Sequence, residues 1–246
     1  MIPKRENEIT RVEAFSDGMI AFAATLLVVN LDPPRSYQEL IGNLYGFVPF
    51  ALSFGALFYI WVVHTTLFRK YALDDKVSIA INGLLLFTVL FYVQPLRFMS
   101  SSFVSLFMNT GGPRVNSFEQ LQNLFIIYSC GWIVVFLLVA VLYWRAYATG
   151  DRLRLTPLEA YDAITWSRHY VGFVLAGIFS ILVALIGIGL RFGLAGAAYM
   201  SIGLFAWLNA RNREPGRALL AQNVADHPQL RDTASISTIG LRESLR

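Results

Sequence analysis

Between Arg11 and Asn30 the chain reads RVEAFSDGMIAFAATLLVVN, and the architecture follows from this first apolar segment. Charge is confined to its beginning, and the run then stays almost wholly apolar until Pro33 and Pro34 end it. On a helix, which turns about 100° per residue, Asp17 lies about 140° away from Phe22. The segment is therefore predicted to form a helix with two unlike faces, one apolar and one carrying a carboxylate.

A stripe of apolar residues, two of them aromatic, lies along one side of this helix. The residues within about 40° of a single line are Phe15, Gly18, Phe22, Leu26 and Val29, with Thr25 about 60° to one side. Ser16 lies about 120° from Phe22 on the other flank. A carboxylate inside an apolar span is costly unless it is paired or hydrated. Asp17 is therefore expected to have a polar partner on a neighbouring helix.

The composition indicates that most of the chain is surrounded by lipid. Hydrophobic residues make up 56% of the 246 residues, charged residues only 15%, and the mean hydropathy is +0.53. These values are unlike those of a soluble domain. The single cysteine, Cys130, excludes an intramolecular disulfide framework and a cysteine-based metal site.

Apolar runs of roughly 20 residues predict an all-α integral membrane protein with six transmembrane helices. The expected spans are about 12–31, 40–67, 77–106, 118–146, 169–190 and 193–210, within a membrane domain of 1–210. Pro49 either kinks the second span or marks its true start. Residues 147–168 are expected to be a loop with a short helix after Pro157, and residues 211–246 a polar, mostly mobile cytoplasmic tail.

The distribution of Lys and Arg predicts the orientation. Three precede the first span, three lie between the second and third, four lie between the fourth and fifth, and six lie in the tail. The opposite side carries four. The positive-inside rule places both termini in the cytoplasm, which requires an even number of spans. In a bacterial cell this predicts a multi-pass protein of the inner (plasma) membrane.

The first segment resembles a known family. The string Arg11-x-x-x-Phe15-Ser16-Asp17-Gly18, followed by Thr25-Leu26-Leu27-Val28, is similar to the first-helix signature of the endosomal/lysosomal potassium channel family. It is closest to the bacterial branch, which carries one six-helix repeat per chain. The resemblance extends less sharply to Trp61, His64, Asn82 and Pro95.

The resemblance implies a potassium-preferring cation channel. In the family, the first helices of four subunits line the ion path, so this chain is expected to form a homotetramer. The positions implied for the hydrophobic constriction are Phe22, Leu26 and Val29, with the Thr25 hydroxyl close by. A ring of apolar side chains around the ion path can close it to ions by excluding water. Phe22 departs from the usual Ile or Leu, which affects how readily the path opens and how strongly it prefers potassium.

The polar residues around the first helix have more than one possible role. We interpret Arg11, Phe15, Ser16, Asp17, Trp61, His64 and Asn82 as a structural network that fixes the rotation of this helix. A direct proton or ion relay through Asp17 and His64 is the alternative, and it corresponds to a proton- or cation-coupled secondary transporter. Two further possibilities stay open, namely a membrane scaffold without transport, and an apolar stripe that simply packs against lipid or another helix.

The sequence gives little indication of an enzyme. The three histidines, His64, His169 and His227, lack the spacing of a zinc site, and no phosphate-binding loop or nucleophile motif is present. The expectation is therefore no catalytic residue, no metal site and no cofactor other than the permeant K⁺. The expected partners are the other subunits, the lipid bilayer and monovalent cations, without nucleic acid.

Overall fold

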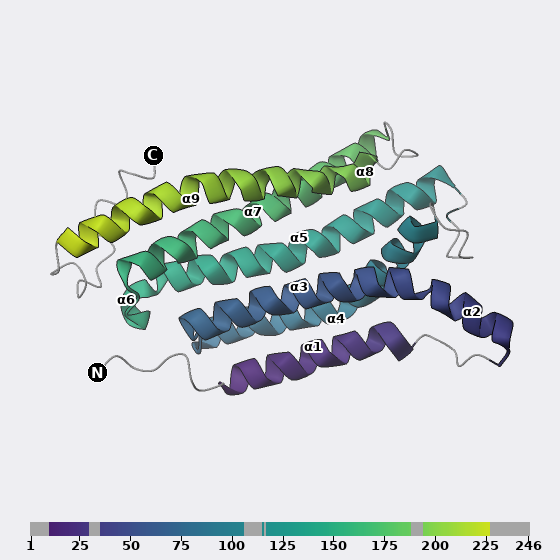
Figure 1. Cartoon of the computed structure of the whole chain (residues 1–246), viewed down its shortest axis with the longest axis horizontal. Coiled ribbons are helices and arrows are strands. Elements are labelled where there is room, and N and C mark those ends of the chain that lie inside the picture. The colour runs from purple at the N-terminus through teal and green to yellow at the C-terminus, as the bar shows by residue number, and fades with distance from the viewer. Residues whose placement is uncertain (1–9, 30–34, 106–114, 116, 188–193, 227–246) are drawn as a thin grey trace.

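The computed structural model describes residues 10–29, 35–105, 115, 117–187 and 194–226, and this part of the chain is a bundle of helices without strands (Figure 1). The elements in chain order are α1 (Arg11–Val29), α2 (Tyr37–Tyr45), α3 (Phe47–Tyr71), α4 (Lys76–Ser105), α5 (Phe118–Ala148), α6 (Gly150–Leu153), α7 (Pro157–Ile186), α8 (Leu194–Ala197), a 3₁₀ turn (Ala198–Met200) and α9 (Ser201–Asp226). The all-helical class predicted from hydropathy is confirmed.

The long helices lie side by side in a layered order. α1 packs against α3 and α4, α4 packs against α5, α5 runs along α7, and α9 lies on the far side of α7 (Figure 1). Aromatic rings fill the centre where α5 meets α7. The ring centroids of Trp132 and Phe136 are 4.5 Å apart, and those of Phe136 and Phe173 are 4.7 Å apart. α1 thus lies at one edge of the bundle, away from the aromatic rings between α5 and α7.

Local sequence signals explain where several helices begin and end. At the start of α7 the Thr156 side chain accepts from the Glu159 backbone N–H while the Glu159 carboxylate accepts from the Thr156 N–H, and Pro157 occupies the first helical position. Gly187 ends α7 with a left-handed φ of 75°, which glycine adopts without strain.

Two predicted segments differ in extent from the helices of the structure, although α3 begins close to Pro49, as one of the two alternatives for that proline predicted. The second predicted segment is two helices, since α2 ends at Tyr45 and α3 begins at Phe47. Pro49 therefore lies in the first turn of α3, where its missing N–H costs nothing. The fifth segment does not begin near residue 169 after a loop. One helix runs from Pro157 to Ile186, because the residues from 157 onward bury their small and polar side chains against neighbouring helices.

The predicted mobile tail also differs from the structure. α9 continues through residue 211 to Asp226, and Leu220 is buried. Contacts with α7 hold this part of α9: the Tyr161 hydroxyl donates to the Arg213 carbonyl, and Arg213 and Arg217 form ion pairs with Asp162. Residues 227–246 lie outside the described ranges.

Within the described ranges, four helices are long and apolar enough to cross a membrane, namely α3, α4, α5 and α7. α1 carries three charged residues in its first two turns, and α9 is largely polar beyond residue 210. The structure therefore accounts directly for four of the six predicted spans.

Asp75 joins three elements at the end of the bundle where α3 turns into α4. Its carboxylate caps α4 by accepting from the Ser78 backbone N–H at 3.3 Å and the Ser78 hydroxyl at 2.5 Å. Arg145 of α5 donates to the same carboxylate, forming an ion pair. Burial raises the pKa of Asp75, but the hydrogen bonds from Arg145 and Ser78 outweigh it and hold the pKa well below its ordinary value.

Replacing Asp75 should therefore destabilise the protein in a pH-dependent way. We expect Asp75→Asn to lose about 2 kcal/mol of stability at neutral pH, because the Arg145 guanidinium loses its charged acceptor. Since the folded pKa lies below the unfolded value of about 3.9, this stabilisation is present well above that pH and is lost as the pH falls below it. Thermal unfolding in detergent as a function of pH measures the effect.

Asp74 provides the matched control for this experiment. Its side chain is 77% exposed, and its contact with Arg152 is 3.9 Å long. Exposed pairs of this kind contribute little. Equal losses of stability in Asp74→Asn and Asp75→Asn would contradict the role of the Asp75–Arg145 pair.

Candidate functional site

The polar side of α1 is fastened to α3 and α4 by a chain of hydrogen bonds. His64 Nε2 lies 2.8 Å from Asn82 Oδ1, and because an amide oxygen only accepts, the histidine nitrogen donates. Asn82 Nδ2 donates to Ser16 Oγ at 2.9 Å, and Ser16 Oγ donates to the Val12 carbonyl at 2.7 Å. Ser16, His64 and Asn82 are all buried. Three helices thus meet through side chains whose polar groups satisfy one another.

Asp17 makes a second link between α1 and α3. Trp61 Nε1 donates to Asp17 Oδ1 at 2.8 Å. We refer to Ser16, Asp17, Trp61, His64 and Asn82 as the α1 polar cluster. These five residues are among those predicted from the sequence to form one network, and the structure brings them into two adjacent hydrogen-bonded groups, one through Ser16 and one through Asp17.

Two residues predicted to belong to this network lie outside it. Arg11 is exposed and makes no hydrogen bond or ion pair within the described residues. The Phe15 side chain is 62% exposed and lies about 100° around the helix from Ser16. Arg11 and Phe15 therefore belong to the outward side of α1.

A residue that was not predicted from the sequence completes the start of α1. The Glu13 carboxylate accepts from the Thr10 N–H at 2.7 Å, and the Glu13 N–H donates to Thr10 Oγ1 at 3.2 Å. This is a capping box, and the Thr-x-x-Glu spacing was available in the sequence. Glu13 is buried, so the box also fixes where α1 enters the bundle.

A small cavity of about 100 Å³ lies beside the α1 polar cluster. Its lining includes both carboxylates at the start of α1, Glu13 and Asp17, together with Arg69 of α3. Thr65 Oγ1 also lines it and is buried without a hydrogen-bond partner. A polar cavity of this size has room for water. Within the described ranges, no three His, Cys, Asp or Glu side chains converge to hold a metal ion.

The opposite side of α1 is open. Phe22 is 56% exposed, Thr25 is exposed, and nothing would lie within 4 Å of a Cβ atom added to Gly18. Thr25 Oγ1 donates to the Phe22 carbonyl at 2.7 Å, so its hydroxyl hydrogen is directed to its own helix. We refer to this side, with Phe15, Gly18, Phe22 and Thr25, as the exposed face of α1.

The centre of the exposed face differs from the predicted stripe. Leu26 is only half-exposed and packs against the core, whereas the neighbouring Thr25 is exposed. At about 100° per residue, the exposed arc is centred close to Gly18 and Thr25, about 40° from Phe22 and about 80° from Leu26. The side chain of Val29 lies outside the described residues.

The layered helices, several of which are long and apolar enough to cross a membrane, define the class, an all-helical membrane protein. The fold matches a crystal structure of a variant of the potassium channel MtTMEM175, bound to a nanobody–MBP fusion protein, with a TM-score of 0.69, 26% identity, and coverage of 92% of this chain and 99% of that one. A crystal structure of a lysosomal potassium-selective channel TMEM175 homolog from Chamaesiphon minutus matches in fold, with a TM-score of 0.56 and 21% identity over 81% of this chain and 96% of that one.

The sequence comparisons identify the family. Residues 11–92 match the model of the endosomal/lysosomal potassium channel TMEM175. A potassium channel of Marivirga tractuosa is 36% identical over 166 residues, which are 64% of this chain and 67% of that protein. The chain belongs to the TMEM175 potassium channel family, and the resemblance noted from its first helix is confirmed. These relatives are named as potassium channels, not as enzymes.

The α1 polar cluster yields a direct stability prediction. Ser16→Ala leaves the buried Asn82 Nδ2 without its acceptor, and we expect a loss of about 1–3 kcal/mol from that unpaired group. Ser53→Ala is the matched control, since Ser53 is equally buried but its hydroxyl donates only to the Pro49 carbonyl of its own helix. Thermal unfolding of both variants in detergent measures the difference. Equal stabilities of the two variants would show that the bond between α1 and α4 contributes nothing.

Proposed function

We propose that this chain forms a homotetrameric channel that conducts K⁺ passively through a central path lined by α1. The single observation that carries the proposal is that the polar side of α1 is fastened inside the bundle while its apolar side is left open. Membership of a family whose relatives are named as potassium channels supports the choice of ion.

Geometry supports a shared axis on the exposed face of α1. α1 lies at the edge of the bundle (Figure 1). Its exposed side carries Phe15, Gly18, Phe22 and Thr25. Four such helices around a fourfold axis enclose a path whose walls are these side chains. Because Gly18 has no side chain, the path is wide at that level, and the Phe22 rings narrow it about one turn further along.

The proposed constriction consists of Phe22 with Leu26 and Val29, and Thr25 lies beside it. A narrow apolar passage excludes water, so an ion passes only by giving up part of its hydration shell. K⁺ holds that shell less tightly than Na⁺, so the passage favours K⁺. The half-burial of Leu26 gives Phe22 the larger part in this constriction.

The membrane arrangement forms part of the proposal. α3, α4, α5 and α7 supply four spans, and α1 together with the first part of α9 supplies the other two. The excess of Lys and Arg at the ends of α3, α5 and α9 supports a cytoplasmic location for that side and for both termini. The protein is then an inner-membrane channel, and no cofactor is needed beyond the permeant ion.

Phe22→Ile tests the proposed constriction. A smaller side chain should widen the passage, raise the K⁺ flux and reduce the preference for K⁺ over Na⁺. A change of about 1 kcal/mol in the barrier alters the rate about fivefold. The measurement is K⁺ and Na⁺ flux from liposomes containing purified protein.

Phe179→Ile is the matched control, because Phe179 on α7 is 53% exposed, close to the 56% of Phe22. We expect it to leave flux unchanged. Equal behaviour of the two variants and the wild type would contradict the assignment of Phe22. Flux that requires a proton gradient would instead favour the coupled transporter, and no flux at all would favour the scaffold.

A further inference from the structure

Three cations from two helices, α3 and α9, converge on one buried carboxylate of α7 at the end of the bundle. Asp162 of α7 has a side chain only 3% exposed. Its Oδ2 accepts from Lys70 Nζ of α3 at 2.7 Å, and its Oδ1 accepts from Arg213 Nη2 of α9 at 2.9 Å. Arg217 Nε of α9 lies 3.3 Å from the same Oδ1. We refer to these four residues as the Asp162 cluster.

This cluster has more positive charge and more donors than its carboxylate can satisfy. Three cations and one carboxylate leave a surplus of two positive charges. Lysine has three N–H donors and arginine five, whereas a carboxylate offers about four acceptor positions. Arg213 Nε is buried without a hydrogen-bond partner. The cluster therefore has capacity for a further acceptor, preferably an anion.

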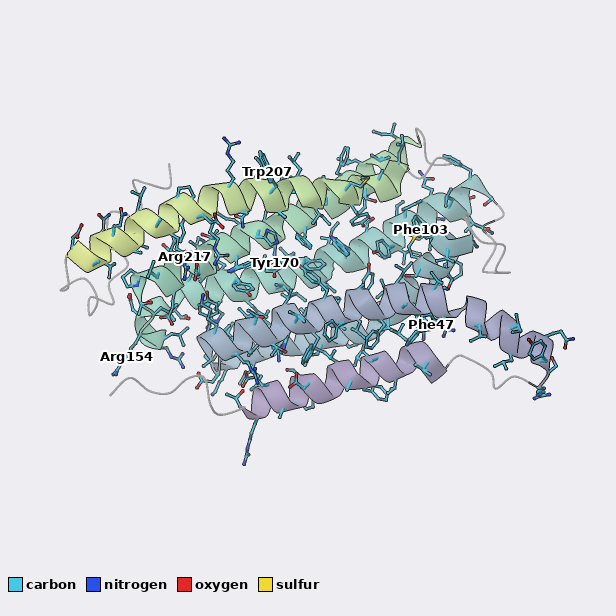
Figure 2. The ribbon with its side chains drawn as sticks, in the orientation of Figure 1. Phe47, Phe103, Arg154, Tyr170, Trp207 and Arg217 are labelled. Carbon is cyan, nitrogen blue, oxygen red and sulfur yellow. The ribbon has the colours of Figure 1, made fainter. Side chains whose placement is uncertain are left out.

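The nearby carboxylates do not remove this surplus. Glu159, one turn before Asp162, uses Oε2 for the backbone N–H and the hydroxyl of Thr156. Glu214 follows Arg213 but is exposed and forms no ion pair within the described part of the chain. The remaining donors of Lys70 and Arg217 are within reach of solvent, since these side chains are 32% and 52% exposed. Figure 2 labels Arg217 on α9.

The cluster also lies at the depth where lipid headgroups meet the protein. Lys70 is one residue from the end of the apolar helix α3, and Asp162 is five residues into α7, about 8 Å along the helix from its start. The Arg213 guanidinium lies over the Trp166 ring at 4.9 Å, and tryptophan is typical of the membrane interface. The charge distribution places this end in the cytoplasm, where anionic lipids attract basic residues.

We propose that Lys70, Arg213 and Arg217 form a binding site for a phosphate group, carried by an anionic lipid headgroup or present as free phosphate. The guanidinium of Arg217 and the ammonium of Lys70 contact the phosphate oxygens. Asp162 holds the three cations in place. Its negative charge repels the phosphate and so limits the affinity of the site for it. Because α9 supplies two of the three cations, occupancy of the site also strengthens the attachment of α9 to α3 and α7.

Binding to the full-length protein in neutral detergent tests this site without any measurement of ion flux. Short-chain phosphatidylglycerol is titrated and counted by native mass spectrometry, with short-chain phosphatidylcholine as the neutral lipid. We expect about one phosphatidylglycerol per chain in the wild type and about fivefold weaker binding in Arg217→Gln. Lys70→Gln should weaken binding to a similar degree.

Arg152→Gln is the matched control, because Arg152 is 65% exposed and its only ion pair in the described residues is the 3.9 Å contact with Asp74. It removes the same charge near the same end of the bundle and should bind like the wild type. A parallel thermal-shift titration with inorganic phosphate distinguishes the source. If phosphate raises the unfolding temperature of the wild type but not of Arg217→Gln, the ligand of the site is free phosphate. If instead Arg217→Gln loses phosphatidylglycerol binding, the ligand is the lipid headgroup.

Two results would overturn the proposal. One is equal binding by Arg217→Gln and Arg152→Gln in both titrations, which indicates unspecific attraction to a basic surface. The other is no preference of the wild type for phosphatidylglycerol over phosphatidylcholine together with no effect of phosphate. Either result leaves the proposed ion conduction untouched, since neither depends on the exposed face of α1.

Discussion

The structure depends on the need to satisfy polar groups on an otherwise apolar helix. Ser16 and Asp17 cannot face lipid without a partner, because an unpaired polar group has no water to bind there. Asn82 and Trp61 supply those partners from α4 and α3. The resulting bonds fix the rotation of α1, and a fixed rotation determines which side chains remain outside. The side that the bonds leave open carries Phe22 and Thr25, so the same constraint that stabilises the helix selects the proposed wall of the ion path.

The end of the bundle where α3 turns into α4 is organised by the same principle with full charges. Asp75 links the turn between α3 and α4 to α5, and Asp162 links α3, α7 and α9. Each is a carboxylate removed from most of its solvent and compensated by basic residues from other helices. Asp75 has a single cation and is balanced, whereas Asp162 has three and is not. That imbalance leaves capacity for a ligand at Asp162 and none at Asp75.

Much of this arrangement could be predicted from residues close together in the sequence. The apolar length of α3, α4, α5 and α7 identified those helices, and the spacing of Asp17 from Phe22 indicated that α1 has two faces. What could not be predicted depends on contacts between distant residues. Only a short helix was predicted after Pro157, because the charged residues that follow it gave no sign of burial. In the structure Asp162 is buried and is paired with Lys70 and Arg213, which are far away in the sequence. Leu26 shares the apolar stripe on a helical wheel, but only the packing of α1 against the bundle shows that it is half-buried.

Cysteine accessibility at Thr25 tests the central claim most directly. With Cys130 replaced by serine, Thr25→Cys places one thiol on the exposed face of α1, and Val134→Cys places another on α5, where Val134 is 39% exposed. We expect a charged, water-soluble thiol reagent to block K⁺ flux through the Thr25→Cys protein and to leave the Val134→Cys protein conducting. Unchanged flux after mass spectrometry has shown complete labelling at residue 25 would contradict the account, because the exposed face of α1 would then lie away from the path of the ion.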